Sequence, residues 1–373
     1  MDGLNIELGV PGQIMPPADR AVDNAKRAEA KGYHSVWWPC HLMGWHPDSV
    51  WTEDLTPLAA VQPNPHVYFD PLLMMGAVGA ATERIRVGSV VTDLIRRNPA
   101  MVAMQTLTLD HLTRGRSILG LGSGEAMNIT PYGLPFDKPV ARLSEGIDVI
   151  RLLWDADGPV SYEGQFHRLD HAVLGLSPYG DRPPEIWTAA HGPRMLDLTG
   201  RKADGWLPTK ISPADYGEGL ATIRAAGGSA GRDMEAFTPS LLAYVLLAPD
   251  EATLDRLCRH PLVRALCVML PPHVYAELGV EPPLGAGGAF HEYLPSTIGR
   301  ADAMAVIDRI PPEVVRFYAF CGTPEQVAEE IAEYHGAGLR HLICWNITAF
   351  GDPSLAGWSF KALDQLHEAL KAA

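Results

Sequence analysis

Short apolar runs alternate along the chain with longer segments in which apolar residues recur every three or four positions. The short runs are typical of buried strands, and the longer segments are typical of amphipathic helices. This alternation predicts repeated strand–helix units around a parallel sheet. We expect eight strands, at Asn5–Val10, His34–Trp38, Ile85–Val91, Arg116–Gly120, Glu185–Ala189, Gly205–Pro208, Ser240–Leu247 and His341–Trp345.

Helical segments separate these strands, and several of them begin with proline and end at glycine, which are favoured at helix starts and ends. The expected helices are Asp19–Lys31, Pro71–Thr82, Pro99–Leu112, Ala141–Trp154, Pro193–Ala203, Pro213–Ala226, Pro324–Gly336 and a closing helix from about Leu355 to Ala372. The length of 373 residues suits a barrel with insertions. We therefore predict an α/β protein with a single (β/α)8 TIM-barrel domain over 1–373; an open doubly wound sheet is the alternative.

Two segments exceed what a minimal barrel needs. Met43–Asp70 is rich in proline, tryptophan and histidine, and Ala248–Ile310 is apolar but broken by Pro-Pro and Gly-Gly pairs. Long connections in a compact barrel usually carry function. We expect insertions 43–70 and 248–310 to form walls or a lid of a substrate pocket; for the second, a packing or oligomerisation role is equally compatible.

Charge and cysteine content narrow the class of protein. The formal net charge is −14, so repulsion from phosphates argues against nucleic acid as a general partner. Five cysteines without a CxxC pair indicate reduced thiols rather than a zinc site. Because no apolar run approaches the roughly 20 residues of a spanning helix, we expect a cytoplasmic protein without integral membrane association.

Polar residues gather where the predicted strands end, which is the face on which barrel enzymes build their sites. Cys40 and His41 follow the second strand, and Trp45 lies close behind them. Adjacent residues on an extended chain point in opposite directions, so Cys40 and His41 are poorly placed to pair as a nucleophile and its base. The third strand is followed by Thr92 and Asp93.

Two further strand ends carry glycine-rich turns. The segment from Leu119 to Asn128 holds three alternate glycines and then Glu125, a carboxyl group that could act as an acid beside an apolar ring. After the fifth strand, Ala190, His191 and Gly192 precede a helix that starts at Pro193. Free amides at such a helix start favour a phosphate site.

Several longer strings resemble the luciferase-like flavin and deazaflavin oxidoreductases, in the branch that uses coenzyme F420. The similarity is greatest to phthiodiolone dimycocerosate ketoreductase-like proteins and covers nearly the whole chain. It is carried by the strings RRNPA, LTRGR, KPVAR, PEIW, AAHGPRML and TGRKADGW. The resemblance implies a luciferase-like TIM barrel, coenzyme F420 as cofactor, hydride transfer and a homodimer.

The resemblance also assigns roles to residues. It implies that His41 donates a proton or polarises the substrate, that Trp45 lines the pocket and that Glu125 contacts the cofactor. Our own hypothesis is that His41 or Glu125 manages the proton. Ser89 and Val90 would carry a non-proline cis peptide behind the ring of the cofactor. Cys40 stands where the family usually has aspartate, so a carboxylate contact is missing. The remaining cofactor contacts implied by the resemblance are Thr92, Gly124, Asn128, Ala190, His191 and Gly192.

Deazaflavin chemistry favours a dehydrogenase or reductase over an oxygenase. We therefore expect hydride transfer between C5 of F420 and a carbonyl or alcohol carbon, with a hydrophobic substrate such as a lipid ketone. Relatives that oxidise sugar phosphates use basic residues for the phosphate, and only Lys210 matches, so glucose 6-phosphate is not the expected substrate. The alternatives are an FMN-dependent monooxygenase on the same barrel and a non-catalytic F420 carrier.

Overall fold

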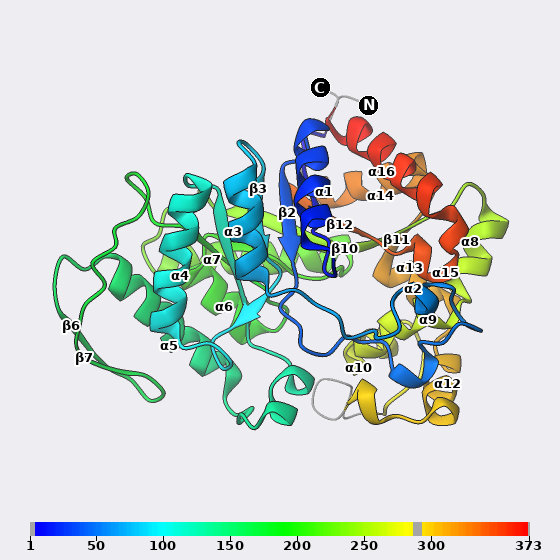
Figure 1. The fold of residues 1–373 in the computed structure, drawn as a ribbon, viewed down its shortest axis with the longest axis horizontal. Helices are drawn as coiled ribbons and strands as arrows, with labels where there is room; N and C mark the ends of the chain where they lie inside the picture. The colour runs from blue at the N-terminus through cyan, green and yellow to red at the C-terminus, as the bar shows by residue number, and fades with distance from the viewer. Residues whose placement is uncertain (1–3, 286–292, 372–373) are drawn as a thin grey trace.

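The computed structural model describes residues 4–285 and 293–371. Eight parallel strands form a closed ring, because the last of them pairs with the first: Gly9 lies in register with both Ser35 and Ile343. This confirms the predicted TIM barrel (Figure 1). In ring order the strands are β1 (Glu7–Pro11), β2 (Ser35–Trp38), β3 (Arg86–Ser89), β5 (Ser117–Gly122), β8 (Glu185–Thr188), β9 (Gly205–Trp206), β10 (Thr238–Leu247) and β12 (His341–Asn346).

All eight predicted helices are present around the ring. The side chains of Asp70, Asn98, Ser212 and Thr323 accept hydrogen bonds from backbone amides in the first turn of the helices that follow them, which fixes where those helices begin. The helices are α1 (Ala18–Ala30), α3 (Pro71–Ala81), α4 (Pro99–Thr113), α5 (Pro139–Trp154), α6 (Pro193–Lys202), α7 (Pro213–Ser229), α14 (Pro324–Gly336) and α16 (Ala356–Lys371). Ala372, predicted in the closing helix, lies outside the described residues.

The third predicted strand is divided in two. It was expected to run to Val91, but β3 ends at Ser89, and the chain pairs again with β5 as β4 (Thr92–Asp93). Between them, the Val90–Val91 bond is cis. The family resemblance placed the cis bond at Ser89–Val90, so that assignment is wrong by one residue.

Three strands were not predicted. β6 (Val160–Glu163) and β7 (Arg168–Ala172) form an antiparallel hairpin outside the barrel, with alternating half-buried and exposed positions. β11 (Ala319–Gly322) pairs with the end of β10, whose start pairs with β9. β10 has ten residues, so one of its edges accommodates two short strands in succession.

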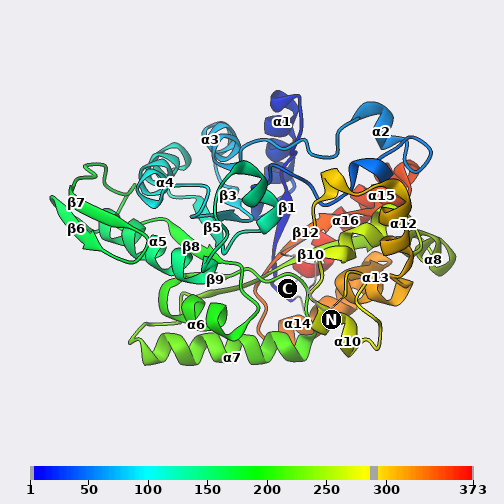
Figure 2. The ribbon, with the colours of Figure 1, turned by 90° about the horizontal axis from the view of Figure 1, so that it is seen from below.

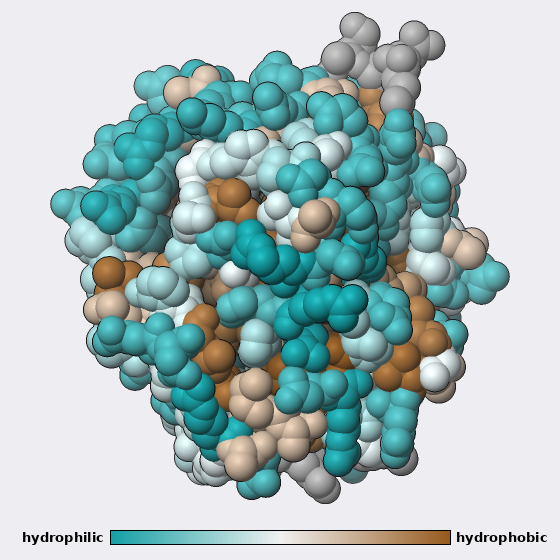
Figure 3. Space-filling view, turned by 90° about the vertical axis from the view of Figure 1, so that its right-hand side faces the viewer, coloured by the Kyte–Doolittle hydropathy of each residue, from teal (hydrophilic) through white to brown (hydrophobic). Residues whose placement is uncertain are grey.

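The two insertions pack together in a second hydrophobic core beside the barrel, on the right in Figure 1. The surface on this side of the molecule is mainly hydrophilic, with small apolar patches (Figure 3). His46 from the first insertion bonds the carbonyl of Leu262 from the second, at 2.8 Å. Residues 286–292 of the second predicted insertion lie outside the described residues. The elements here are η1 (Asp48–Val50), α2 (Leu58–Val61), α8 (Glu251–Cys258), α9 (Pro261–Ala265), η4 (Leu266–Met269), α10 (Pro272–Glu277), η5 (Pro295–Thr297), α12 (Arg300–Asp308), α13 (Pro312–Tyr318), α15 (Thr348–Gly351) and η6 (Pro353–Leu355).

Large side chains fill the barrel at the amino-terminal ends of its strands. The rings of Trp37 and Trp187 are fully buried there, with ring centroids 5.2 Å apart. His341 bridges the hydroxyls of Ser35 and Ser240, at 2.7 and 2.9 Å. The polar strand ends singled out in the sequence lie at the opposite, carboxyl-terminal mouth.

Candidate active site

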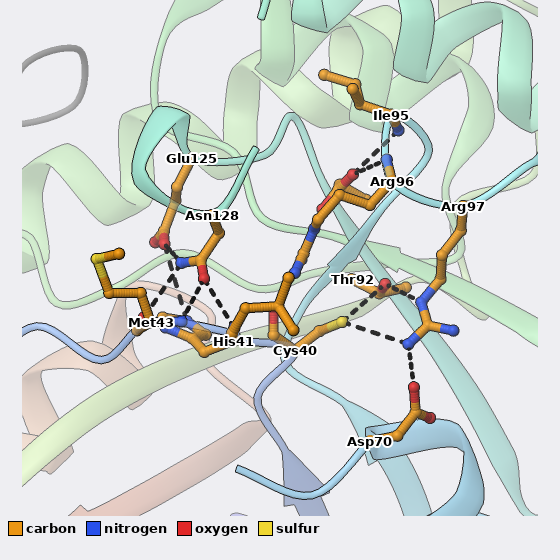
Figure 4. Close-up of polar contacts among 12 residues, drawn as sticks. Cys40, His41, Met43, Asp70, Thr92, Ile95, Arg96, Arg97, Glu125 and Asn128 are labelled. Atoms are coloured by element: carbon orange, nitrogen blue, oxygen red, sulfur yellow. Dashed lines mark hydrogen bonds and ion pairs between the residues drawn. The ribbon is translucent and has the colours of Figure 1, made fainter. Parts of the chain in front are cut away.

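His41 and Glu125 come from different strand ends and meet at the mouth of the barrel (Figure 4). The Nε2 atom of His41 lies 3.9 Å from Oε2 of Glu125, and their side chains are 15% and 22% exposed. Nδ1 of His41 lies 3.3 Å from the Met43 carbonyl, which can only accept a hydrogen bond. A neutral His41 ring that donates through Nδ1 therefore has its Nε2 lone pair directed toward the carboxylate.

Aromatic rings surround His41 on the other sides. The ring centroids of Trp45 and Tyr68 lie 5.7 and 5.4 Å from that of His41. Burial, followed by the charge of Glu125, raises the pKa of Tyr68 above its ordinary value, so this phenol stays protonated at neutral pH. Trp45 and Tyr68 both belong to the first predicted insertion, which therefore contributes to the surroundings of His41.

Asn128 joins the loop of His41 to Glu125. Its Oδ1 atom accepts hydrogen bonds from the amides of Leu42 and Met43, both at 2.8 Å. Its Nδ2 group donates to Oε2 of Glu125 at 3.0 Å and to the Met43 carbonyl at 3.3 Å. The side chain is 2% exposed, and both ends of its amide are engaged within the chain.

Cys40 lies in a polar setting of its own. The Thr92 hydroxyl donates to Cys40 Sγ at 3.3 Å, and Nη2 of Arg97 lies 3.6 Å from the same sulfur. Arg97 also donates from Nε to the Thr92 hydroxyl at 3.1 Å and pairs with the Asp70 carboxylate. The guanidinium therefore finds its carboxylate in Asp70, the N-cap of α3, and not at position 40.

A second arginine holds the backbone beside the site. Arg96 donates from Nη2 to the Cys40 carbonyl at 2.7 Å and from Nε to Asp93 at 2.5 Å. Arg96 and Arg97 were part of the RRNPA resemblance but were not predicted as site residues. Their position just beyond a strand end was the signal that could have identified them.

The glycine-rich turn accommodates its neighbouring strand. Ser89 Oγ donates to the Gly120 carbonyl at 2.9 Å and accepts from the Gly120 amide at 3.0 Å. A Cβ atom at Gly120 would lie 1.8 Å from the Ser89 carbonyl oxygen, and one at Gly122 would lie 2.7 Å from the side chain of Val91. From the sequence, glycines at this turn are expected to let the backbone approach a planar ring. In the structure, Gly120 and Gly122 are required by close packing against the β3–β4 connection.

The start of α6 is open, as the phosphate-site prediction needs. Gly192 is the N-cap residue without a side-chain cap, and no atom lies within 4 Å of where its Cβ would be. The Thr209 amide donates to Nε2 of His191 at 3.2 Å, so this nitrogen carries no proton in that arrangement. Ala190 is buried, and its carbonyl accepts from the Trp206 indole at 2.8 Å.

A narrow cavity of ≈ 20 Å³ is lined by Trp45, Tyr244 and Tyr318 among others, and Trp45 is its link to His41. The indole Nε1 of Trp45 is buried, and within the described ranges it has no hydrogen-bond partner. Burial raises the pKa values of Tyr244 and Tyr318, so both phenols remain protonated. A buried donor without a partner is unfavourable, so this indole N–H is free to donate to an acceptor.

Lys210 also lines this cavity, but its charge is directed elsewhere. Its Nζ atom pairs with Glu330 at 2.8 Å and donates to the Phe317 carbonyl at 2.6 Å. The side chain is 4% exposed. Lys210 is therefore committed to an internal ion pair.

The described part of the chain shows neither a metal cluster nor a spanning helix. Across residues 4–285 and 293–371, no group of three or more histidine, cysteine or acidic side chains is arranged to hold a metal ion. In the same ranges, no helix combines the length and apolar character needed to cross a membrane.

Comparison with known proteins identifies the family. A family model described as luciferase-like monooxygenase matches residues 5–341. The chain belongs to this luciferase-like family. The phthiodiolone/phenolphthiodiolone dimycocerosates ketoreductase of Mycobacterium tuberculosis is 35% identical over 337 residues, which cover 89% of this chain and 88% of that protein. The luciferase-like chain is accordingly an oxidoreductase.

Solved structures agree with the fold. An F420-dependent secondary alcohol dehydrogenase, in complex with an F420-acetone adduct, superposes on this luciferase-like chain with a TM-score of 0.75. It is 21% identical, and the match covers 98% of this chain and 99% of the other. The coenzyme F420-dependent tetrahydromethanopterin reductase of Methanopyrus kandleri gives 0.72 at 20% identity, with coverage of 93% and 98%.

Proposed function

We propose that this luciferase-like protein is an F420-dependent oxidoreductase that interconverts a hydrophobic ketone and the corresponding alcohol. One observation carries the proposal: a histidine–carboxylate pair and a buried, unpartnered indole N–H border the same mouth of the barrel. Carbonyl reduction requires a hydride, a proton and a donor for the developing charge on oxygen. The protein side chains account for the last two.

The residues present fit a flat cofactor that carries a phosphate. The uncapped start of α6 at Gly192 leaves open space beside free amides, which suits the phosphate. The β3–β4 connection at Val90 and Val91 would lie behind the ring, with Thr92 and Gly124 beside it. When bound, F420 would supply or accept the hydride at its C5 position.

His41 would manage the proton. The Met43 carbonyl fixes its Nδ1–H, so Nε2 is the atom that faces the site. In ketone reduction a protonated Nε2 would give its proton to the carbonyl oxygen as the carbon receives the hydride, leaving a neutral ring and an alcohol. Glu125, held by Asn128, would stabilise the protonated ring as a carboxylate, and the neutral ring left after the step would take up a new proton from water. The Trp45 indole would donate a hydrogen bond to the same substrate oxygen.

The walls of the site favour an apolar substrate. Aromatic surface comes from Trp45, Tyr68, Tyr244 and Tyr318, and the lysine that lines the cavity, Lys210, is paired internally. A lipid ketone is consistent with these walls and with the name of the mycobacterial relative. The first insertion would then supply part of the substrate wall through Trp45 and Tyr68.

Cofactor titration tests this function directly. The purified protein is titrated with F420 and with FMN while cofactor fluorescence is followed; tight F420 binding is expected. Tight FMN binding without F420 binding would reject the assignment, and oxygen consumption with reduced FMN would support the family's monooxygenase activity instead. A carrier protein without turnover would bind F420, but the absorbance of the bound cofactor would not change when a ketone or an alcohol is added.

We also propose that two copies associate through α3 and α4. These helices lie side by side, and α3 contains no charged residue. Leu73 is 75% exposed, and Met101 and Met104 on α4 are 50% and 40% exposed. Such a contiguous apolar face is typical of an interaction surface. On a chain with a net charge of −14, it is a face that two copies can bring together without charge repulsion. We expect this assembly to act in the cytoplasm, where its five free thiols stay reduced.

A further inference from the structure

A groove of ≈ 540 Å³ lies between α5 and α6, outside the cavity at His41. The two helices are neighbours in both ribbon views (Figures 1 and 2). Val140 and Pro193, in the first turns of the helices, border one end of the groove, and Lys202 borders the other. At 1.5 Å per residue, the groove follows α6 for roughly 12 Å.

The groove has a basic wall on an acidic protein. Arg194, Arg201 and Lys202 line it, against one acidic residue, Asp197. Within the described part of the chain, the side chain of Arg194 has no ion pair or hydrogen bond and is exposed. Arg201 and Lys202 already pair with Asp197 and Asp148, so the positive charge that this wall presents comes from Arg194, on a chain that carries −14 as a whole.

Arg201 and Lys202 already have acidic partners, and the ion pair of Arg201 is the weaker of the two. Arg201 pairs with Asp197 at 2.9 Å, but these side chains are 44% and 52% exposed. Exposed pairs of this kind contribute little free energy, so Arg201 can exchange its partner for a carboxylate of a ligand. Lys202 is less available, because Asp148 binds its Nζ atom at 2.6 Å.

We propose that this groove binds the polycarboxylate chain that continues from the phosphate of F420. The proposal rests on the proposed function and extends it. The groove begins at Pro193, the residue after the Gly192 amide, so a phosphate at the start of α6 directs whatever follows it toward Arg194. F420 carries a lactyl group and a chain of glutamates beyond its phosphate, whereas FMN ends at its phosphate. The groove thus favours F420 over FMN by charge as well as by length.

Three forms of the cofactor test the groove: F420 with several glutamates, the same molecule without glutamates, and FMN. Dissociation constants are measured by fluorescence at low and high salt. We expect the form with glutamates to bind about tenfold more tightly than the form without them, from two or three charge-assisted contacts. The advantage should fall as salt rises, because these contacts are exposed.

Variants locate the effect. In the Arg194→Gln/Arg201→Gln protein, the advantage of the glutamate chain should shrink to less than twofold, with unchanged binding of the form without glutamates. Arg224→Gln, an exposed arginine on α7, is the matched control and should keep the advantage. The proposal that the groove binds the glutamate chain is overturned if the native protein binds both F420 forms equally. It is also overturned if the double variant still binds the form with glutamates more tightly. Failure of both F420 forms to bind overturns the proposed function instead, so the two failures are distinguishable.

Discussion

The Nε2 atom of His41 lies 3.9 Å from Oε2 of Glu125, although 84 positions of sequence, from 41 to 125, separate the two residues. At this distance the pair is in contact electrostatically without a direct hydrogen bond. A substrate oxygen near Nε2 can therefore receive the proton of the ring without first breaking a strong internal bond.

Replacing His41 by glutamine should remove the proton donor and leave cofactor binding intact. We expect the rate of ketone reduction to fall roughly 10²–10⁴-fold, the usual contribution of a general acid. Steady-state turnover and fluorescence titration with F420 measure the two quantities. His34→Gln, at the opposite end of β2, is the control and should retain turnover. Full activity of His41→Gln would contradict the proton role of His41.

Asn128 should act as a positioning residue for the same chemistry. In Asn128→Asp, a carboxylate replaces the amide that donates to Glu125 at 3.0 Å. Two carboxyl groups at this distance resist joint ionisation, so the apparent pKa of the pair rises. We expect the acidic limb of the pH–rate profile to move upward by about one pH unit or more. A purely structural role would lower the rate at every pH without moving that limb; Asn24→Asp on α1 controls for added charge.

The barrel could be predicted from sequence because its signals are local. Each ring strand is an apolar run, and Pro71, Pro99, Pro193, Pro213 and Pro324 mark the first positions of five helices. β11 could not be predicted in this way. Its four residues, Ala319–Gly322, follow α13 directly, and they form a strand only because the end of β10 offers an unpaired edge.

In the candidate site too, some features could be predicted from the sequence and others could not. His41 and Glu125 follow strand ends, so closure of the barrel alone brings them to one mouth. The Asn128 bonds to Met43 span 85 residues, and the pair between Arg97 and Asp70 depends on how α3 begins. Such contacts are set by tertiary packing, and no periodicity in the sequence encodes them. Ser89 illustrates the opposite error: family resemblance found the correct strand end but placed the cis bond one residue too early.

His46 should make stability depend on pH. It is buried between the two insertions, and burial lowers its pKa from 6.5 to about 4. The unfolded chain takes up a proton below pH 6.5 while the folded chain does not, so stability is complete above pH 6.5 and falls as the pH decreases toward 4. The loss at pH 5 is about 2 kcal/mol from this group.

Urea unfolding at pH 7.5 and pH 5 measures this loss. His46→Gln keeps a donor for the Leu262 carbonyl but does not titrate, so its stability should fall about 2 kcal/mol less between the two pH values than that of the native protein. Comparing each protein with itself removes the contribution of other titrating groups. An equal fall in both proteins would show that His46 is protonated in the folded state.

The apolar face of α3 and α4 gives a prediction for assembly. In the Leu73→Glu/Met104→Glu protein, four glutamates would meet across a two-fold axis, and like charges in an apolar interface are strongly unfavourable. We expect sedimentation equilibrium to give twice the chain mass of 40.5 kDa for the native protein and the single chain mass for the variant. Phe360→Glu on α16, which is 59% exposed, provides a matched control and should remain dimeric. Two results would contradict association through α3 and α4: a native protein that is monomeric at micromolar concentration, and a double variant that remains dimeric. Since Arg97 pairs with the N-cap of α3, turnover of a folded monomeric variant would further reveal whether the dimer supports the site.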